Sequence, residues 1–329
     1  MRALALSLIV LLAACSGANT PSEEGTRDGV SATTDGPTDG GAVGAGTSGH
    51  DAGASLPSAL LGDALARHKA ELLTSIWENG TTILQYGYCE DIDDGRGYTS
   101  GRAGFCSGTG DAVLVAKCVA SAAPGAKIAK YVPALEAITK RFESTGKDQA
   151  STSKLDAVGR YCADWTADAT GELAAVVKTC QDEVVEELYF APARAEMTRY
   201  DLTSALALAA LYDAEINHGD EGKDGVAELA AKAAKQAGKG DESRWLEAFL
   251  SIRLALLAGD ETWAEAVDRV ALYEQLRRDG NLDLTKPITT NAKAAKLFPG
   301  KKLKDSEYPS CTIAPDGAVS GDPDCTKPR

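Results

Sequence analysis

The chain has 329 residues, of which 25% are charged, and its formal net charge is -14 with a sequence pI of about 4.8. This acidic balance disfavours nucleic acid as a partner, because phosphate groups require a basic surface. It suits a polycationic partner, but the same acidity would also keep an exported protein in solution, so charge alone does not choose between the two.

The first residues, 1–14, predict a signal peptide. Arg2 precedes an apolar run that is too short to anchor stably in a bilayer, and small residues lead to Cys15. Residues 12–15, LAAC, match a bacterial lipobox, in which cleavage before the cysteine leaves its sulfur to carry a diacylglycerol. The alternative is an ordinary signal that leaves Cys15 unmodified. Acylation would attach the protein lastingly to a membrane, so we expect an exported cell-envelope lipoprotein, at the outer membrane or cell surface.

Residues 15–55 are predicted to be a disordered tether behind the lipidated cysteine. They are rich in Gly, Ser, Thr and Asp, and they cannot bury enough apolar surface to offset the entropy of ordering. A coil of this length spans on the order of 35 Å, enough to hold a domain away from lipid headgroups. The rest divides into a predicted domain, 56–300, and a cysteine-containing tail, 301–329; no later apolar run has membrane length.

The domain is predicted to be mostly helical. Apolar residues recur at helical spacing over 60–77 and an Asn-Gly pair then stops the run, so Glu78 is expected in the last turn. A second helical run opens at Asp111. Further amphipathic stretches cover 130–142, 155–166, 173–194, 202–217, 225–236, 245–257 and 264–278. Only 96–105 is typical of short strands joined by a turn.

Seven cysteines remain once Cys15 is set aside: Cys89, Cys106, Cys118, Cys162, Cys180, Cys311 and Cys325. An exported chain can oxidise them, and the odd number predicts at least one thiol that is free or pairs between chains. The pairing we favour is Cys311 with Cys325, which would close a tail with little core of its own. The absence of C-x-x-C and H-x-x-x-H motifs disfavours zinc.

The segment 78–111 concentrates carboxylates and glycines and interrupts the helical pattern. Glu78 ends a predicted helix and Asp94 lies in a glycine-rich turn. Two carboxyl groups in different surroundings are what is needed to protonate a leaving group and to activate a water. Thr99 could help to fix that water, and Arg96 would favour the ionised form of Asp94. Judged from their spacing alone, Glu78 and Asp94 would more often be two solvated surface charges than a catalytic pair.

Other ligands of this segment are less favoured. The aspartates before Gly95 lack the spacing and the closing glutamate of a calcium loop. The glycines before Asp111 could cradle an anion at a helix N-terminus, but no strand precedes them and no lysine lies among them. Asp111 would also repel a phosphate. It has a sufficient role as an N-cap, although a carboxylate at the edge of a cleft could equally receive a substrate ammonium.

The string CEDIDDGRGYTSGRAGFCSGTGD, with Glu78 and Asn79 upstream, resembles the signature of the glycoside hydrolase family 46 chitosanases. Five further blocks follow in the family's order: AKYVPAL, ELYFAPA, LYDAEINHG, GDESRWLEAFLSIR and DGNLDL. The resemblance covers 60–287. It implies a mainly α (α+β), two-lobed lysozyme-like fold, with a small β-sheet in the first lobe and a cleft between the lobes.

The resemblance also implies an activity, namely endo-hydrolysis of β-1,4 glucosamine linkages in chitosan, with inversion and with no metal or other cofactor. Glu78 matches the general acid, Asp94 the general base and Thr99 the residue that helps to hold the attacking water. The two carboxyl groups are then expected roughly 6.5–9.5 Å apart or more, which leaves room for the water. Asp111 matches a carboxylate that receives a substrate amine.

Other matches extend the implied site. Further substrate-binding residues match at Asn79, Tyr88 and Arg96. A charge network that positions the acid matches at Asp213, Arg253, Asp260 and Arg269. Asp260 stands where a glutamate is usual, and Arg269 is reached only after a one-residue shift, so an ordinary inter-lobe salt bridge is the alternative for it. The anionic cleft would suit polycationic chitosan, and the chain is expected to be a monomer.

Two alternative functions stay open. The chain could hydrolyse another amino sugar polymer, such as partly acetylated chitin or peptidoglycan, because the implied fold resembles lysozyme. Asp111 argues against this, since an N-acetyl group offers it no ammonium. The chain could also be a non-catalytic, chitosan-binding surface lipoprotein, which the joint presence of Glu78, Asp94 and Thr99 disfavours.

Overall fold

The computed structural model describes residues 64–92, 96–145, 152–238, 240–260, 263–303 and 306–328. The predicted signal peptide, Cys15 and the predicted tether lie outside these ranges, and so does Asp94. Within them, none of the helices combines the length and the hydrophobicity that crossing a membrane requires.

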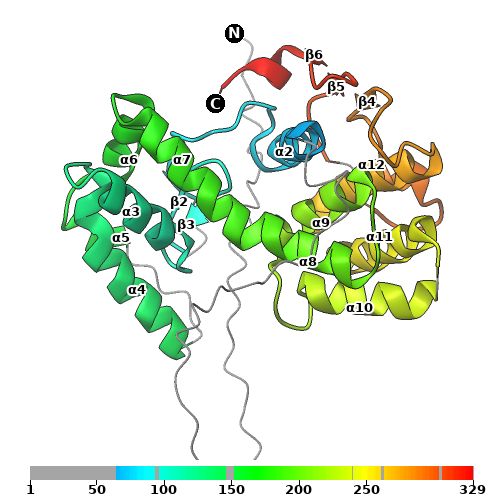
Figure 1. Cartoon of the computed structure of the whole chain (residues 1–329), viewed down its shortest axis with the longest axis horizontal. Coiled ribbons are helices and arrows are strands. Elements are labelled where there is room, and N and C mark those ends of the chain that lie inside the picture. Colours follow the sequence, from blue (N-terminus) through cyan, green and yellow to red (C-terminus); the bar gives the residue numbers. More distant parts are fainter. Residues whose placement is uncertain are drawn as a thin grey trace, which may run out of the picture.

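The described residues form a mainly helical fold in two groups of helices, as predicted (Figure 1). Helix α2 (Ala64–Asn79) lies between them. The first group contains α3 (Asp111–Ala122), α4 (Val132–Thr145), α5 (Thr152–Asp156), α6 (Tyr161–Thr170) and α7 (Ala174–Val185). The second contains α8 (Ala191–Arg199), α9 (Ala205–His218), α10 (Val226–Ala237), α11 (Glu242–Gly259), α12 (Val267–Arg278) and α13 (Ala294–Leu297). Short 3-10 helices are η1 (Ile128–Tyr131), η3 (Ala264–Ala266) and η4 (Pro323–Thr326).

One long helical connection joins the two groups. Helix α7 continues through a π-helical turn, η2 (Glu186–Phe190), into α8, and this connection crosses the molecule in Figure 1. The predicted helix over 173–194 is therefore confirmed and extends to Arg199. By contrast, the stretch 155–166 is divided between α5 and α6, because the chain turns at 157–160. π-helical turns inside α-helices are frequent at functional sites.

The first group carries a small antiparallel sheet. Strands β1 (Cys89–Asp91), β2 (Tyr98–Ser100) and β3 (Phe105–Cys106) pair in that order, which confirms the strands predicted in 96–105. The turn before β3 requires glycine, because Gly101 has a φ of 73° and an added Cβ would lie 2.5 Å from the Gln181 side chain.

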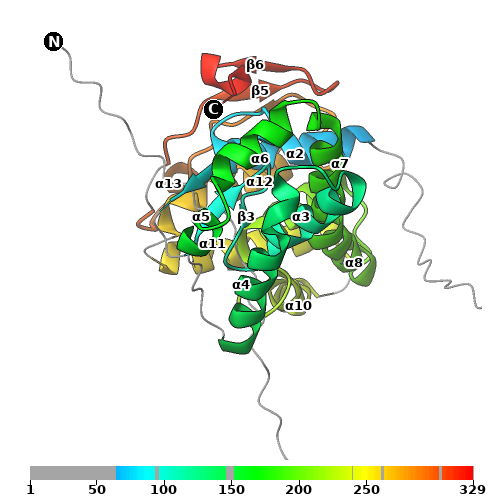
Figure 2. The ribbon, with the colours of Figure 1, turned by 90° about the vertical axis from the view of Figure 1, so that its left-hand side faces the viewer.

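A second antiparallel sheet, which the sequence did not predict, is built partly from the tail. Strand β4 (Ile288–Thr289) pairs with β5 (Cys311–Ile313), and β5 pairs with β6 (Val319–Gly321). Both views place β5 and β6 at one edge of the molecule, above α2 (Figures 1 and 2). Strands of two or three residues are too short to show a period, and this pairing joins distant segments, so a local pattern cannot reveal it. The tail thus packs on the domain.

Three disulfides tie the described elements together. Cys89 is bonded to Cys162, Cys118 to Cys180, and Cys311 to Cys325, so the pairing predicted within the tail is confirmed. The prediction of a free or inter-chain thiol is wrong for the described residues, none of which is a free cysteine.

Helix α9 forms the centre of the second group, because all of its residues are buried. A helix that is buried on every side should be apolar all round, yet α9 carries Asp213, Glu215, Asn217 and His218. Polar groups in such a position cost free energy unless they are paired. The partners of Asp213, Asn217 and His218 define the candidate site, whereas neither carboxyl oxygen of Glu215 has a hydrogen-bond partner among the described residues.

Candidate active site

Glu78 lies in the last turn of α2, where the sequence placed it, and its exposed fraction is only 5%. The helix ends because Gly80 has a φ of 63°, and its N–H donates to the carbonyl of Ile76 at 2.9 Å. Asn79, the last helical residue, is also buried, and its side-chain Nδ2 has no hydrogen-bond partner among the described residues.

Arg269, from α12, connects Glu78 to Asp213. Its Nη2 lies 2.7 Å from Glu78 Oε1 and 2.7 Å from Asp213 Oδ1, and its Nε lies 3.1 Å from Asp213 Oδ2. The guanidinium is therefore bidentate toward Asp213 and shares one nitrogen with Glu78. Such charge-assisted pairs are the strong and geometrically specific ones. The contact supports the match of Arg269 that required a one-residue shift in the sequence.

Arg253, from α11, holds Asp213 from the other side. Its Nη1 lies 2.6 Å from Asp213 Oδ2, and its Nε donates to His218 Nε2 at 3.1 Å. Burial, and then the positive charges of Arg253 and Arg269, lower the pKa of His218 well below its usual value. The imidazole is thus a neutral acceptor in this arrangement. His218 gave no functional signal in the sequence.

We call Glu78, Asp213, Arg253 and Arg269 the acid-side network. Asp213 and Arg253 have exposed fractions of 0%, and that of Arg269 is 1%. Burial alone would raise the pKa of Asp213, but the two guanidinium groups outweigh it and hold that pKa below its usual value. The Asp213 carboxylate therefore lies between two guanidinium groups, and its negative charge offsets part of theirs.

Asp260, which the resemblance implied as a further member of this network, is not buried with the other members. It is exposed and forms the C-cap of α11 with an extended backbone, φ -115° and ψ 125°. The helix ends at Gly259, so the chain has already left the buried face when it reaches Asp260.

Asp111 is the first residue of α3, and the predicted N-cap role is wrong, because the N-cap is Gly110 with a φ of 112°. Its carboxyl group accepts a hydrogen bond from Thr109 Oγ1 at 3.0 Å. Burial raises the pKa of Asp111 to about 6, against the opposing effects of Thr109, backbone N–H groups and the charge of Arg96. Arg96 thus lies within electrostatic reach of Asp111.

Tyr189 lies within electrostatic reach of Asp111 and Glu78, and sequence analysis missed it. It lies in the π-helical turn η2 and is buried. Its pKa is raised well above the usual value by burial first, and next by the charge of Asp111, with Glu78 also contributing. The phenol therefore lies within electrostatic reach of both carboxyl groups. The block ELYFAPA contains Tyr189, but nothing in it distinguishes this residue from its neighbours.

The remaining predicted residues lie on or near the first sheet. Thr99 is fully buried in β2, with its Oγ1 3.7 Å from Cys106 Sγ. The hydroxyl of Tyr88 donates to Glu90 Oε2 at 3.1 Å. Asp94 is outside the described residues, so its distance from Glu78 stays a prediction.

A metal centre has little support in the described part of the chain. The one group of close-lying potential ligands there is Cys118, Cys180 and Glu183. Because the two cysteines form a disulfide, their sulfurs are not available as thiolate ligands.

Comparisons with known proteins point in one direction. Residues 72–288 match glycosyl hydrolase family 46. A chitosanase of Bacillus subtilis is 38% identical over 234 residues, which is 68% of this chain and 80% of that protein. The crystal structure of a native Bacillus subtilis chitosanase superposes with a TM-score of 0.62 at 36% identity, covering 70% of this chain and 95% of that one. A Gynuella sunshinyii chitosanase in complex with chitotetraose gives 0.61 at 34% identity, covering 69% and 93%.

Proposed function

We propose that this chain, which belongs to glycosyl hydrolase family 46, is a chitosanase. In the proposed reaction it cuts β-1,4 glucosamine linkages within chitosan chains and inverts the anomeric configuration. The similar chitosanases support the substrate, and one of them was solved with chitotetraose. The observation that carries the proposal is the buried contact of Arg269 with both Glu78 and Asp213, because it fixes a carboxyl group for acid chemistry at a helix end.

In this mechanism, Glu78 protonates the glycosidic oxygen of the leaving sugar. Arg269 occupies Oε1 at 2.7 Å, so the transferred proton belongs on Oε2. Asp94 removes a proton from a water that attacks the anomeric carbon from the opposite face, and Thr99 helps to hold that water. Bond breaking and water attack then occur in a single displacement, which yields the inverted product.

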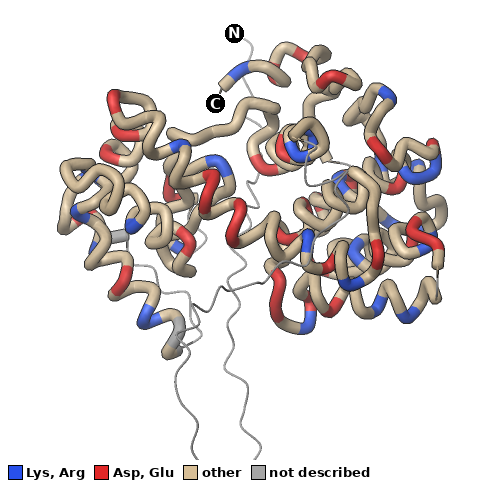
Figure 3. The backbone as a smooth tube through the Cα atoms, in the orientation of Figure 1, with Lys and Arg blue, Asp and Glu red and all other residues tan. Residues whose placement is uncertain are grey.

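Asp111 is proposed to receive the ammonium group of a glucosamine unit. Its pKa of about 6 leaves the carboxyl group ionised at neutral pH, although burial disfavours the charge. An incoming ammonium would supply the missing counter-charge. Asn79, Tyr88 and Arg96 are proposed as further substrate contacts. Acidic residues occur on both groups of helices (Figure 3), so attraction of the polycation need not depend on one patch.

The proposal includes export and attachment to the cell envelope through an acylated Cys15, with the tether carrying a monomeric domain away from the membrane, at the outer membrane or cell surface. The lipobox LAAC at 12–15 supports it. A Cys15→Ser variant of the full chain is expected to leave the membrane fraction after cell fractionation, whereas the parent stays in it.

The decisive experiment measures reducing ends released from fully deacetylated chitosan, from chitin and from peptidoglycan, by the parent domain and by Glu78→Gln. Release from chitosan alone, reduced at least about a thousandfold in the variant, supports the proposal. Activity confined to chitin or peptidoglycan would show that the substrate is an acetylated polymer and not chitosan. Binding to chitosan without release of reducing ends would show that the protein is a non-catalytic binder. Anomer-resolved NMR of the first products tests inversion.

A further inference from the structure

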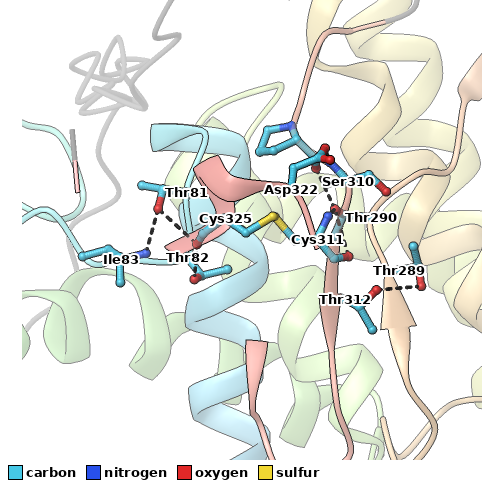
Figure 4. The surroundings of a disulfide bond; sticks show 11 residues. Thr81, Thr82, Ile83, Thr289, Thr290, Ser310, Cys311, Thr312, Asp322 and Cys325 are labelled. Atoms are coloured by element: carbon cyan, nitrogen blue, oxygen red, sulfur yellow. Dashed lines mark hydrogen bonds between the residues drawn. A yellow bond between two sulfur atoms is a disulfide. The ribbon is translucent and has the colours of Figure 1, made fainter. Parts of the chain in front are cut away.

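The C-terminal segment, defined here as residues 306–328, lies beyond the family match at 72–288, yet it contacts residues that flank both partners of the ion pair between Glu78 and Arg269. Its first contact is with the chain just after Glu78. The carbonyl of Cys325 accepts hydrogen bonds from the Thr82 N–H at 3.0 Å, from Thr82 Oγ1 at 2.6 Å and from Thr81 Oγ1 at 3.2 Å (Figure 4). Three donors on one carbonyl fix the exit of α2.

The disulfide between Cys311 and Cys325 connects this contact covalently to the second sheet. Cys325 is bonded to Cys311, and Cys311 belongs to β5, whose neighbour β4 precedes α13 (Figure 4). The N–H of Cys311 also donates to Thr290 Oγ1 at 2.8 Å. Both cysteines are fully buried. The loop after Glu78 is therefore tied to a sheet that packs on the second group of helices.

The other end of the segment holds the start of α12, which carries Arg269. Asp268 precedes Arg269 and is 1% exposed. Its Oδ2 accepts from the N–H of Ser306 at 2.8 Å and from Lys293 Nζ at 3.0 Å. Its Oδ1 accepts from the N–H of Ala294 at 2.7 Å. The Asp268 carboxylate thus fastens the segment directly beside Arg269.

Tyr308 lies between these two attachments. Its ring meets that of Trp77, the residue before Glu78, edge-on at 4.8 Å with an angle of 90°. Burial raises the pKa of Tyr308 to about 12, and the charges with the largest further effects on that pKa are those of Arg269 and Glu78. The side chain thus packs on the residue before Glu78 and lies within electrostatic reach of the ion pair.

We infer that the C-terminal segment is a positioning element for the general acid, with Tyr308 as the positioning residue that keeps Glu78 and Arg269 in register. The inference rests on the proposed role of Glu78. Arg269 and Glu78 are 191 residues apart, and each is flanked by a residue that the segment contacts. A displacement of about 1 Å at a reacting group can cost a hundredfold in rate, so this restraint would act on kcat.

The test compares Tyr308→Ala and Tyr308→Phe with the parent in kcat, KM and thermal midpoint on deacetylated chitosan. Tyr308→Ala is expected to lower kcat about tenfold or more with KM within about twofold, and Tyr308→Phe, which keeps the ring, to restore most of the rate. Tyr200→Ala is the matched control. Tyr200 also packs on a tryptophan, Trp245, at 5.7 Å, but outside the acid-side network. It should lower the thermal midpoint and leave kcat unchanged.

The inference would be overturned if Tyr308 had a purely structural role. In that case Tyr308→Ala would lose thermal stability as Tyr200→Ala does, but its kcat would stay within about twofold of the parent. If the Tyr308→Ala protein does not fold, a second variant tests the inference. The double variant Cys311→Ala/Cys325→Ala leaves Tyr308 in place. Assayed at a temperature below its thermal midpoint, it should show a kcat about threefold or more lower than that of the parent. An unchanged kcat contradicts the inference. A parent without activity on chitosan would instead reject the proposed function.

Discussion

The two halves of the candidate site hold their carboxyl groups by different means. In the acid-side network, Asp213 is paired with Arg253 and Arg269 in the interior, and its pKa lies below the usual value. Asp111, in the glycine-rich half, relies on a hydroxyl group and backbone N–H groups, and burial raises its pKa to about 6. Paired charges in the core keep their ionisation state, whereas Asp111 titrates near neutral pH.

This difference suggests a division of labour. Asp213, Arg253 and Arg269 are buried and paired with one another, so they are suited to hold Glu78 in one geometry under all mild conditions. The half around Asp111 carries the first sheet, the turn at Gly101 and the disulfide from Cys89 to Cys162. Its charge depends on pH and on an incoming cation. Changes in pH should therefore affect substrate affinity through this half before they disturb the acid.

The largest effect should come from breaking the acid-side network at Arg269. Arg269→Ala would leave Asp213 with one guanidinium partner and Glu78 without its contact, so the free energy of unfolding should fall by about 3–5 kcal/mol. Urea unfolding at pH 7 measures this loss. Arg269→Lys keeps the charge but not the bidentate geometry. Compared with Arg269→Ala, it should recover part of the free energy of unfolding but little of kcat. Equal unfolding free energies for the parent and Arg269→Ala would contradict the assigned network.

A smaller effect is expected at Asp111, and it should fall on affinity. Asp111→Asn preserves the shape and the acceptor for Thr109 but removes the charge, so kcat/KM on deacetylated chitosan should fall about tenfold at pH 7. The control is partly acetylated chitosan, on which the loss should be smaller because fewer units carry an ammonium group. A loss of equal size on both substrates would show that Asp111 does not receive the amine.

The parts of this comparison that the sequence predicted are those with local signals. Glu78 at a helix end followed from the helical period and the Asn-Gly stop. The contact of Glu78 with Arg269 joins residues 191 apart, so only the family resemblance indicated it. Residue patterns alone left Asp111 as either an N-cap or a cleft carboxylate, and the cap proved to be Gly110.

The errors have a physical pattern as well. Asp260 was assigned by position in the resemblance, but the end of α11 leaves it exposed. Tyr308 lies beyond the resemblance, and the two-residue and three-residue strands that bring it to Trp77 have no periodic signal. Burial and long-range pairing thus decided what the local pattern could not.

The smallest effect, and the sharpest contrast between the two halves, is the pH dependence of kcat/KM. Because the pKa of Asp111 is raised to about 6, its carboxylate is present above that pH and is lost as the pH falls through it. At pH 5 about one-tenth of Asp111 stays ionised, so the advantage of the parent over Asp111→Asn should shrink from about tenfold at pH 7 to about twofold. Asp213, with a lowered pKa, stays ionised throughout this range.

The ratio of parent to Asp111→Asn in kcat/KM, measured from pH 5 to pH 7.5, follows this titration as long as the chitosan amines stay protonated, because a deprotonated amine would give the Asp111 carboxylate no ammonium to bind. A ratio that rises from pH 5 and flattens only near pH 7 is the expected curve. A flat ratio would mean that Asp111 does not change its charge in this range. A ratio that falls with pH would mean that the protonated carboxyl group is the form that binds, which would reverse the assignment of Asp111 as the anionic partner of the substrate ammonium.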